Sequence, residues 1–185
     1  MPAMKNILGI IASPRKGGNT DSLIREILKS ANEYGSGIDK VYLYDYAITP
    51  CNACNSCKET KNCIHDDDFE KIIEKMKNSS VWIIGTPVYW WGPSAQLKAF
   101  IDRWYGVERA VFRDQLCALV IPSGGSGRSY SRHVVGMLED IFSYLGIKHQ
   151  GTILASGHGS RGSVLRDEQL MSEARDLGKQ LAGLV

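Results

Sequence analysis

Short apolar runs rich in β-branched residues alternate along the chain with longer segments that have the periodicity of helices. Ile7–Ile11 and Val81–Ile84 are apolar at nearly every position. Strands that are apolar on both faces occur in parallel sheets covered by helices on each side. The pattern predicts strands at Asn6–Ala12, Asp39–Tyr44, Ser80–Gly85, Leu116–Pro122 and Gly151–Ala155.

Amphipathic segments separate and follow these strands, because apolar residues recur at intervals of three and four positions. The acidic run Asp66–Asp68 precedes the second of them and suits a helix N-terminus. Apolar stripes mark predicted helices at Leu23–Ala31, Phe69–Met76, Leu97–Trp104, Val134–Leu145 and Leu170–Leu181. Five successive strand–helix units predict an α/β fold, a flavodoxin-like three-layer sandwich around a parallel sheet of order 2-1-3-4-5.

The length of 185 residues suits one domain, residues 1–185, with a core large enough to fold without disulfides. The net charge of +2 is small and the Lys and Arg residues are scattered, which argues against nucleic-acid binding. The sequence has no apolar stretch near the roughly 20 residues that cross a membrane, and its N-terminus lacks the features of a secretory signal. We therefore expect a cytoplasmic protein whose thiols are reduced.

In this strand order, ligands bind at the carboxyl ends of the strands, where the order reverses between the first and third strands. The loop after the first strand, Ser13–Thr20, is rich in glycine and leads directly into a helix. Ser13 and Thr20 offer hydroxyls and Arg15 a positive charge. Gly18 frees the backbone at the helix N-terminus, so the loop suits a phosphate. It lacks the ending of a Walker A loop, and an ordinary capped strand-to-helix turn is the alternative.

The loop after the third strand, Thr86–Ser94, contains two prolines, a glycine and three adjacent aromatic residues, Tyr89–Trp91. Aromatic side chains at this point of the sheet favour contact with a flat ligand or a partner subunit. Core packing beneath the next helix is the alternative. The loop after the fourth strand, Ser123–Gly127, is flexible, and its backbone amides could hydrogen-bond the edge of the same ligand.

Four of the five cysteines lie in a Cys-rich loop at about residues 50–66, as Cys51, Cys54, Cys57 and Cys63. Two-residue spacings direct successive sulfurs at one small object, and bacterial-type ferredoxin loops hold a [4Fe–4S] cluster in this way. A metal-free thiol loop, a zinc site and disulfides remain as alternatives, in that order. The chain has no second Cys-x-x-Cys pair to favour zinc, and a reducing compartment disfavours disulfides.

The Cys-rich loop follows the second strand, a neighbour of the first, so we expect it beside the phosphate-binding loop and within electron-transfer reach of the ligand. His65 could replace a thiolate but is interpreted as a surface histidine; Cys117 is interpreted as a buried core thiol, and His133 and His149 receive no role. Gly157–Gly162 matches G-x-G-x-x-G, but a dinucleotide site also needs a following strand and an acid about 20 residues on. We interpret it as a turn.

Three segments, Ser13–Thr20, Thr86–Arg103 and Ala174–Lys179, resemble the NADPH-dependent FMN reductase superfamily of flavodoxin-like proteins, and the resemblance runs essentially end to end. The spacing of the four cysteines resembles the iron–sulfur flavoprotein branch of that superfamily. The resemblance implies bound FMN, preferred over FAD because no further sequence is left to hold an adenosine. The implied cofactor-binding residues are Ser13, Arg15, Gly18, Asn19 and Thr20 around the phosphate, Pro87, Val88, Tyr89, Trp90 and Trp91 against the isoalloxazine, and Ser123, Gly124 and Gly125 on its other side.

The resemblance implies an electron-transfer iron–sulfur flavoprotein that binds FMN and a [4Fe–4S] cluster on the four cysteines, with the chemistry supplied by the cofactors rather than by a protein acid or base. Its partner would be a redox protein such as ferredoxin or a small-molecule acceptor. A homodimer or homotetramer would bring one subunit's cluster toward another's flavin, with Trp90 and Trp91 in the interface. The alternative is an NAD(P)H-dependent FMN or quinone reductase that uses FMN only, and a zinc-stabilised flavin-binding module ranks last.

Overall fold

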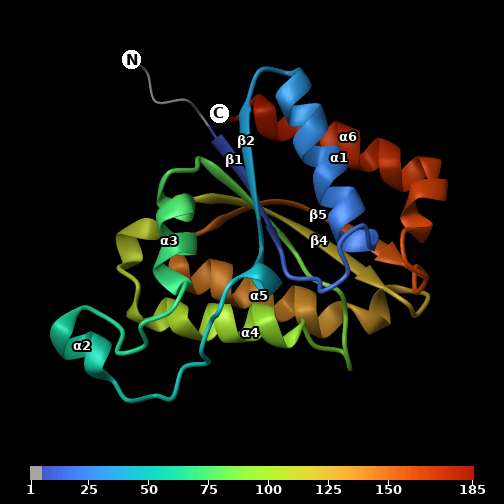
Figure 1. The fold of residues 1–185 in the computed structure, drawn as a ribbon. Coiled ribbons are helices and arrows are strands. Elements are labelled where there is room, and N and C mark those ends of the chain that lie inside the picture. Colours follow the sequence, from blue (N-terminus) through green and yellow to red (C-terminus); the bar gives the residue numbers. More distant parts are fainter. Residues whose placement is uncertain (1–5) are drawn as a thin grey trace.

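The computed structural model describes residues 6–185 and has a parallel β-sheet at its centre (Figure 1). Within that range the sheet has five strands in the order β2-β1-β3-β4-β5, as predicted. Strand β1 pairs with β2 on one side and with β3 on the other, so that Ile7 lies opposite Ile38 and Val81. The strands are β1 (Asn6–Ile11), β2 (Gly37–Tyr42), β3 (Val81–Gly85), β4 (Leu116–Ser123) and β5 (Lys148–Ser156).

All five predicted strands are present; β1, β3 and β4 differ from their predicted bounds by one residue at one end, and β2 and β5 differ by more. Strand β2 begins and ends two residues earlier than expected, because Leu43–Asp45 forms a short 3₁₀ turn. Strand β5 begins at Lys148 rather than Gly151, and its pairing with β4 shifts register between Cys117 and Ala118. The first residues of β5 are largely polar and lie at the edge of the sheet, so they carry no apolar signal.

Helices cover both faces of the sheet, which confirms the three-layer prediction (Figure 1). Helices α1 and α6 lie on one face, and α3, α4 and α5 lie on the other. The short helix α2 was not predicted, and it stands apart from both layers. The helices are α1 (Asn19–Glu33), α2 (Ser56–Thr60), α3 (Phe69–Lys77), α4 (Ala95–Asp102), α5 (Arg132–Leu145) and α6 (Glu168–Ala182). Nothing in residues 6–185 forms a helix with the length and apolar character needed to cross a membrane.

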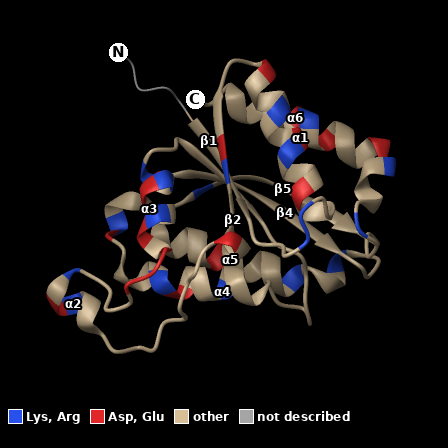
Figure 2. Ribbon diagram, in the orientation of Figure 1, with Lys and Arg blue, Asp and Glu red and all other residues tan. Residues whose placement is uncertain are grey.

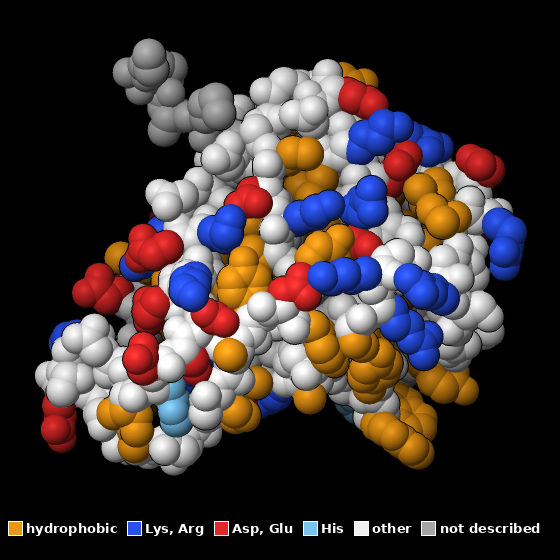
Figure 3. Space-filling view, viewed as in Figure 1, with side chains coloured by type: hydrophobic (Ala, Val, Ile, Leu, Met, Phe, Trp, Pro, Cys, Tyr) orange, Lys and Arg blue, Asp and Glu red, His pale blue; other side chains and the backbone are white. Residues whose placement is uncertain are grey.

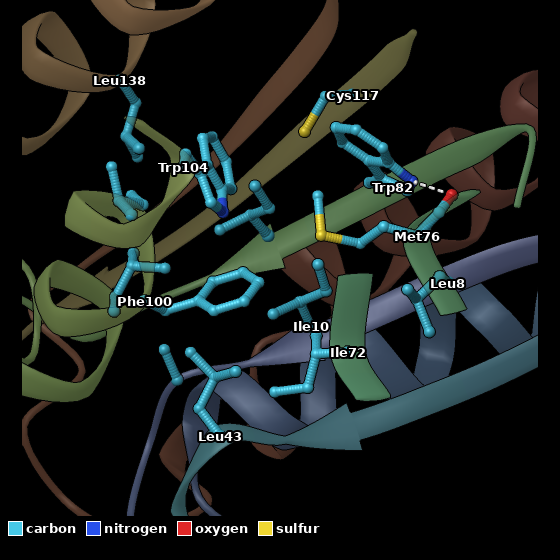
Figure 4. Close-up of a cluster of buried hydrophobic side chains, with 14 of the residues drawn as sticks. Leu8, Ile10, Leu43, Ile72, Met76, Trp82, Phe100, Trp104, Cys117 and Leu138 are labelled. Atoms are coloured by element: carbon cyan, nitrogen blue, oxygen red, sulfur yellow. Dashed lines mark hydrogen bonds between the residues drawn. The ribbon is translucent and has the colours of Figure 1, made fainter. Parts of the chain in front are cut away.

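Alternation along the strands divides the core between the two faces of the sheet. In β1, Ile7 and Ile11 pack toward α1 and α6, whereas Leu8 and Ile10 pack toward α3, α4 and α5. Figure 4 shows the second cluster, in which the Trp82 indole N–H donates to the carbonyl oxygen of Met76 at 3.0 Å. Such a bond satisfies a polar atom that would otherwise be buried alone.

Cys117 lies in this second cluster and is fully buried, as predicted from its place in the fourth strand (Figure 4). Burial raises the pKa of the Cys117 thiol well above its ordinary value, so this residue behaves as a small hydrophobe rather than as a nucleophile. Along the helices, Lys and Arg residues are interspersed with Asp and Glu residues (Figure 2). The molecule therefore does not present one uniformly basic face in this view.

Candidate functional site

A groove opens at the carboxyl ends of β1, β3, β4 and β5, at the predicted switch point of the sheet. It encloses about 440 Å³, including its opening to solvent. Three of the loops that line it are those singled out from the sequence, and the fourth follows β5. The lining residues are Ser13, Arg15, Gly18, Asn19, Thr20, Pro87, Val88, Tyr89, Pro122, Ser123, Gly124, His158, Gly159 and Arg161.

The loop after β1 forms the part of the groove best suited to an anion. Helix α1 follows Gly18 directly, and within the described residues no side chain caps it. The first backbone amides of the helix are therefore available to a ligand, and the positive end of the helix dipole lies beside them. The Ser13 hydroxyl accepts the Arg15 backbone N–H at 3.2 Å, and Thr20 is buried at the base of the groove.

Asp21 holds the curvature of this loop, a role that the sequence analysis missed. Its carboxylate is 1% exposed and accepts the Gly17 backbone N–H at 2.6 Å. The Tyr42 hydroxyl donates to the other carboxylate oxygen at 3.0 Å. Burial and this hydrogen bond together raise the pKa of Tyr42, so the phenol stays a donor. An acidic residue in the first turn after a glycine-rich loop was the signal available in the sequence.

The side chain of Asn19 is engaged by other parts of the protein. The carboxamide nitrogen donates to the carbonyl oxygens of His158 at 2.7 Å and Ser160 at 2.9 Å. The carboxamide oxygen accepts the Val164 backbone N–H at 3.3 Å. The side chain therefore anchors the loop after β5 to α1, and only the backbone of Asn19 remains for a phosphate.

The segment Gly157–Gly162 forms an irregular loop, as predicted, but it also builds a wall of the groove. Arg161 donates to the carbonyl oxygen of Lys16 and lies against Gly17. The His158 ring lies between Ser163, at 3.2 Å from Nδ1, and Asp167, at 3.3 Å from Nε2. This wall was not predicted, because the segment was interpreted only as a match to a dinucleotide motif. Its position after a parallel strand was the signal that could have found it.

The loop after β3 contains a tight turn in which Tyr89 and Gly92 exchange backbone hydrogen bonds, each of 2.9 Å. Trp90 and Trp91 occupy the turn with φ values of 49° and 61°, the left-handed region. This conformation costs a non-glycine residue roughly 1–2 kcal/mol, and such strain concentrates at functional sites. The Trp90 side chain is 92% exposed.

The Trp91 ring instead faces Tyr130, with centroids 6.2 Å apart and planes 10° from parallel. The two rings line a second hollow that shares Val88, Ser123 and Gly124 with the groove, so the two spaces adjoin each other. Gly125 is required here, because a Cβ atom at this position would lie 2.5 Å from the Tyr130 ring. Apolar side chains protrude at the lower right of Figure 3, below several Lys and Arg side chains. The hollow offers flat apolar walls next to the anion-binding loop.

The loop after β2 begins beside the phosphate-binding loop, as expected, because Lys16 Nζ lies 2.7 Å from Asp45 Oδ2, but the four cysteines lie farther along it. After β2 the segment 43–50 runs along α4, where both line a small cavity. Cys51 lines a separate apolar groove with Trp104 and Tyr105, beyond the end of α4, and Cys57 contacts Gly106. Figure 1 shows α2 and its flanking segments at the far left of the molecule. The second strand's position therefore did not determine where its loop ends.

The thiol loop, which we define as residues 50–66, does not gather its sulfurs in this structure. Cys51 and Cys54 are exposed and Cys57 and Cys63 are half-buried. Among residues 6–185, no three His, Cys, Asp or Glu side chains form a group that could hold a metal. Hydrogen bonds from Ser56 lower the pKa of the Cys54 thiol, which favours the thiolate. Four accessible thiols suit a cluster in donor chemistry, and the loop would have to rearrange to bind one.

The backbone of this loop is also unusual. Ala53, Asn55 and Lys61 all have φ values near 60°, in the left-handed region. His65, expected on the surface, is half-buried, and its Nε2 atom is buried without a hydrogen-bond partner in the described part of the chain. Helix α2 buries none of its described side chains. The loop is thus locally strained and weakly packed.

This chain is similar to proteins of one known family. Residues 5–161 match the family model for NADPH-dependent FMN reductase. YwqN of Bacillus subtilis, named as an NAD(P)H-dependent FMN-containing oxidoreductase, is 33% identical over 175 residues, covering 90% of this chain and 92% of YwqN. The iron–sulfur flavoprotein MJ1083 of Methanocaldococcus jannaschii is 44% identical over 97 residues, which are 52% of this chain and 50% of that protein.

Among solved structures, the Trp repressor binding protein of Bacillus subtilis superimposes with a TM-score of 0.72 at 25% identity, over 94% of this chain and 98% of that one. The match to MJ1083 spans only half of that relative, whereas the matches to YwqN and to the solved structure span nearly whole chains. This chain therefore belongs to the NADPH-dependent FMN reductase family.

Proposed function

We propose that this protein is an electron-transfer flavoprotein that binds FMN in the groove and a [4Fe–4S] cluster on the thiol loop. The observation that carries the proposal is the presence, in one chain, of an anion-binding groove at the switch point and of four accessible thiols with ferredoxin-like spacing. FMN exchanges electrons singly or in pairs, whereas a cluster exchanges them one at a time. Residues 1–185 form a single domain in this proposal, and the protein is cytoplasmic.

Different residues of the groove bind different parts of FMN in this proposal. Ser13, Arg15, Gly18 and Thr20, with the backbone of Asn19, hold the phosphate at the start of α1. The hollow beyond them receives the ring system, which is flat and largely apolar. The ring would lie between Pro87, Val88, Tyr89, Trp90 and Trp91, from the groove and the hollow, on one side and Ser123, Gly124 and Gly125 on the other, with Tyr130 beside Trp91.

The thiol loop supplies Cys51, Cys54, Cys57 and Cys63 to the cluster, and these four thiols hold it as thiolates. Because this loop lies away from the groove of its own chain, we propose a homodimer or homotetramer in which one subunit's loop approaches another's groove. The exposed Trp90 side chain is the part of the groove rim most available for such an interface. Electrons then pass to a redox protein such as ferredoxin or to a small-molecule acceptor.

Iron and acid-labile sulfide assays on anaerobically purified protein test the proposal, together with its visible spectrum. We expect flavin bands and a broad cluster absorption, with equimolar iron and sulfide. Protein that contains FMN but takes up neither iron nor sulfide after anaerobic reconstitution would refute the cluster while leaving the flavin site intact.

A second function, an NAD(P)H-dependent FMN or quinone reductase without a cluster, is supported by one observation: the similarity to YwqN spans nearly the whole of both chains. Anaerobic mixing with NADH and with NADPH separates the two. Rapid bleaching of the flavin by either nucleotide supports the reductase, and slow bleaching with fast reduction by ferredoxin supports electron transfer.

A further inference from the structure

Both ends of the thiol loop meet at one buried ion pair, Asp67–Arg103. The Arg103 guanidinium donates to Asp67 Oδ2 at 2.9 Å and to the carbonyl oxygen of Thr49 at 3.0 Å. The same Asp67 oxygen accepts the Thr49 backbone N–H at 2.8 Å. The Arg103 and Asp67 side chains are only 2% and 7% exposed. Two side chains thus bind both backbone polar groups of Thr49, the residue just before the loop.

Further hydrogen bonds join the two ends of the loop to each other and to helices of the core. The Ala47 backbone N–H donates to Asp68 Oδ2, and the Asp68 backbone N–H donates to the Ala47 carbonyl oxygen, both at 2.9 Å. The other oxygen of Asp67 accepts the Phe69 N–H at 3.1 Å, where α3 begins. Arg103 directly follows α4 and lies 4.4 Å above the centre of the Phe69 ring. The ends of the loop are therefore fixed to α3 and α4.

The stability of the fold does not by itself explain a buried ion pair of this kind, because well-packed apolar residues often stabilise a protein as well or better. The segment between the fixed ends is the strained and weakly packed one, with three left-handed residues and exposed thiols. In addition, the buried Nε atom of Arg103 and the Nε2 atom of His65 lack hydrogen-bond partners in the described residues. This pattern suits a loop that changes its arrangement while its two ends stay in place.

We propose that Asp67 and Arg103 are positioning residues for a four-thiol metal site on the thiol loop. Pinning Thr49 to Asp67 shortens the freely moving chain to the residues between them, so gathering the four sulfurs costs less conformational entropy. The inference rests on the proposed function, because it assigns the loop to a metal group. It goes further in naming the residues, outside the cysteines, that set the affinity of the site.

Cobalt(II) is a suitable probe, because thiolate-to-cobalt absorption reports binding without any requirement for cluster assembly. The full-length, reduced protein would be titrated as wild type, Asp67→Asn, Arg103→Lys and the double variant Asp67→Asn/Arg103→Gln. The double variant removes both charges, so it leaves no uncompensated ion if a single variant fails to fold. The control is Leu181→Ala, a core variant in α6 on the opposite face of the sheet.

We call the Asp67–Arg103 pair, with the bonds it makes to Thr49, the clamp. We expect its variants to bind cobalt about tenfold more weakly or worse, as for other residues that orient metal ligands, with Arg103→Lys the least affected. Their FMN content stays at the wild-type level, and Leu181→Ala retains wild-type cobalt affinity despite its lower melting temperature. Wild-type cobalt affinity in the double variant would overturn the inference, and so would absence of thiolate-to-cobalt bands in the wild type. If the wild type binds cobalt but assembles no iron–sulfur cluster, the proposed function fails while the positioning role stands.

Discussion

The groove and the thiol loop differ in how much of each is formed before any ligand binds. The groove is built from four loops that are cross-linked through the backbone: the Val88 N–H donates to the Pro122 carbonyl oxygen, and the His158 N–H donates to the Ser123 carbonyl oxygen. The thiol loop has exposed sulfurs and is fixed to the core at its base. The sheet therefore forms the nucleotide site before any ligand binds, whereas the thiol site depends on the clamp and on its ligand.

The largest loss of unfolding free energy should follow when only one partner of the Asp67–Arg103 pair is removed. Asp67→Ala leaves the Arg103 guanidinium buried and uncompensated, which costs about 3–5 kcal/mol of unfolding free energy. Urea denaturation measures it. The matched control is Asp102→Ala, which removes one partner of the exposed Lys98–Asp102 pair on α4 and should cost less than about 1 kcal/mol. Equal losses in the two variants would contradict the view that the base of the thiol loop is rigid and buried.

Acid should release the same clamp. Burial alone would raise the pKa of Asp67, but hydrogen bonds from Arg103, Thr49 and Phe69 outweigh it and lower the pKa from 3.8 to about 2. A carboxylate with a depressed pKa stabilises the fold fully above its unfolded pKa, and this contribution disappears as the pH falls from about 4 to about 2. The loss amounts to about 2 kcal/mol.

Denaturation midpoints measured across this pH range would show a step in the wild type. The step should be missing in Asp67→Asn, whose side chain does not titrate. A step of the same size in both proteins would assign the acid sensitivity to other carboxylates. FMN release over the same range tests the comparison further, because the groove should lose its ligand independently of the thiol loop.

On the side of the groove, Asp21→Asn should weaken FMN binding about tenfold. The neutral amide has a single acceptor oxygen, so either the Gly17 N–H or the Tyr42 hydroxyl loses its buried partner, at about 1–3 kcal/mol. Titration by flavin fluorescence measures the affinity. Tyr42→Phe removes only one donor and should have the smaller effect. Cobalt binding by the thiol loop should be unchanged in both variants, and a loss there would show that the two regions are coupled.

The sequence predicted the groove better than the thiol loop, for a physical reason. Strands apolar on both faces imply a parallel sheet, and a parallel sheet implies where its loops converge, so Ser13–Thr20 and Thr86–Ser94 were placed together correctly. The Asn19 side chain could not be assigned in this way, because its partners lie about 140 residues away, after β5. The path of residues 43–50 along α4 depends on tertiary packing that no local pattern encodes.

The contact between Asp67 and Arg103 could not be predicted from the sequence either. Asp67 was interpreted through its acidic run as part of a helix start, and its bond to the Phe69 N–H agrees with that prediction. Its bond to Arg103 joins residues 36 positions apart and could not be seen in the spacing. Long-range polar contacts between side chains of ordinary type are thus what sequence patterns leave out.

The smallest expected effect is a change in FMN affinity when one of two neighbouring residues at the rim of the groove is replaced. Trp91→Ala removes the ring that faces Tyr130, and an aromatic contact of this kind contributes about 0.5–1.5 kcal/mol beyond its buried area. FMN affinity should therefore fall several-fold, and the fluorescence of the bound flavin should rise as a quenching ring is lost. Trp90→Ala should change both less than Trp91→Ala does, because that side chain is almost wholly exposed, and should also lower the sedimentation coefficient if Trp90 lies in a subunit interface. Equal losses of FMN affinity in the two variants would mean that the strained turn acts as one unit, so that either indole maintains the shape of the hollow.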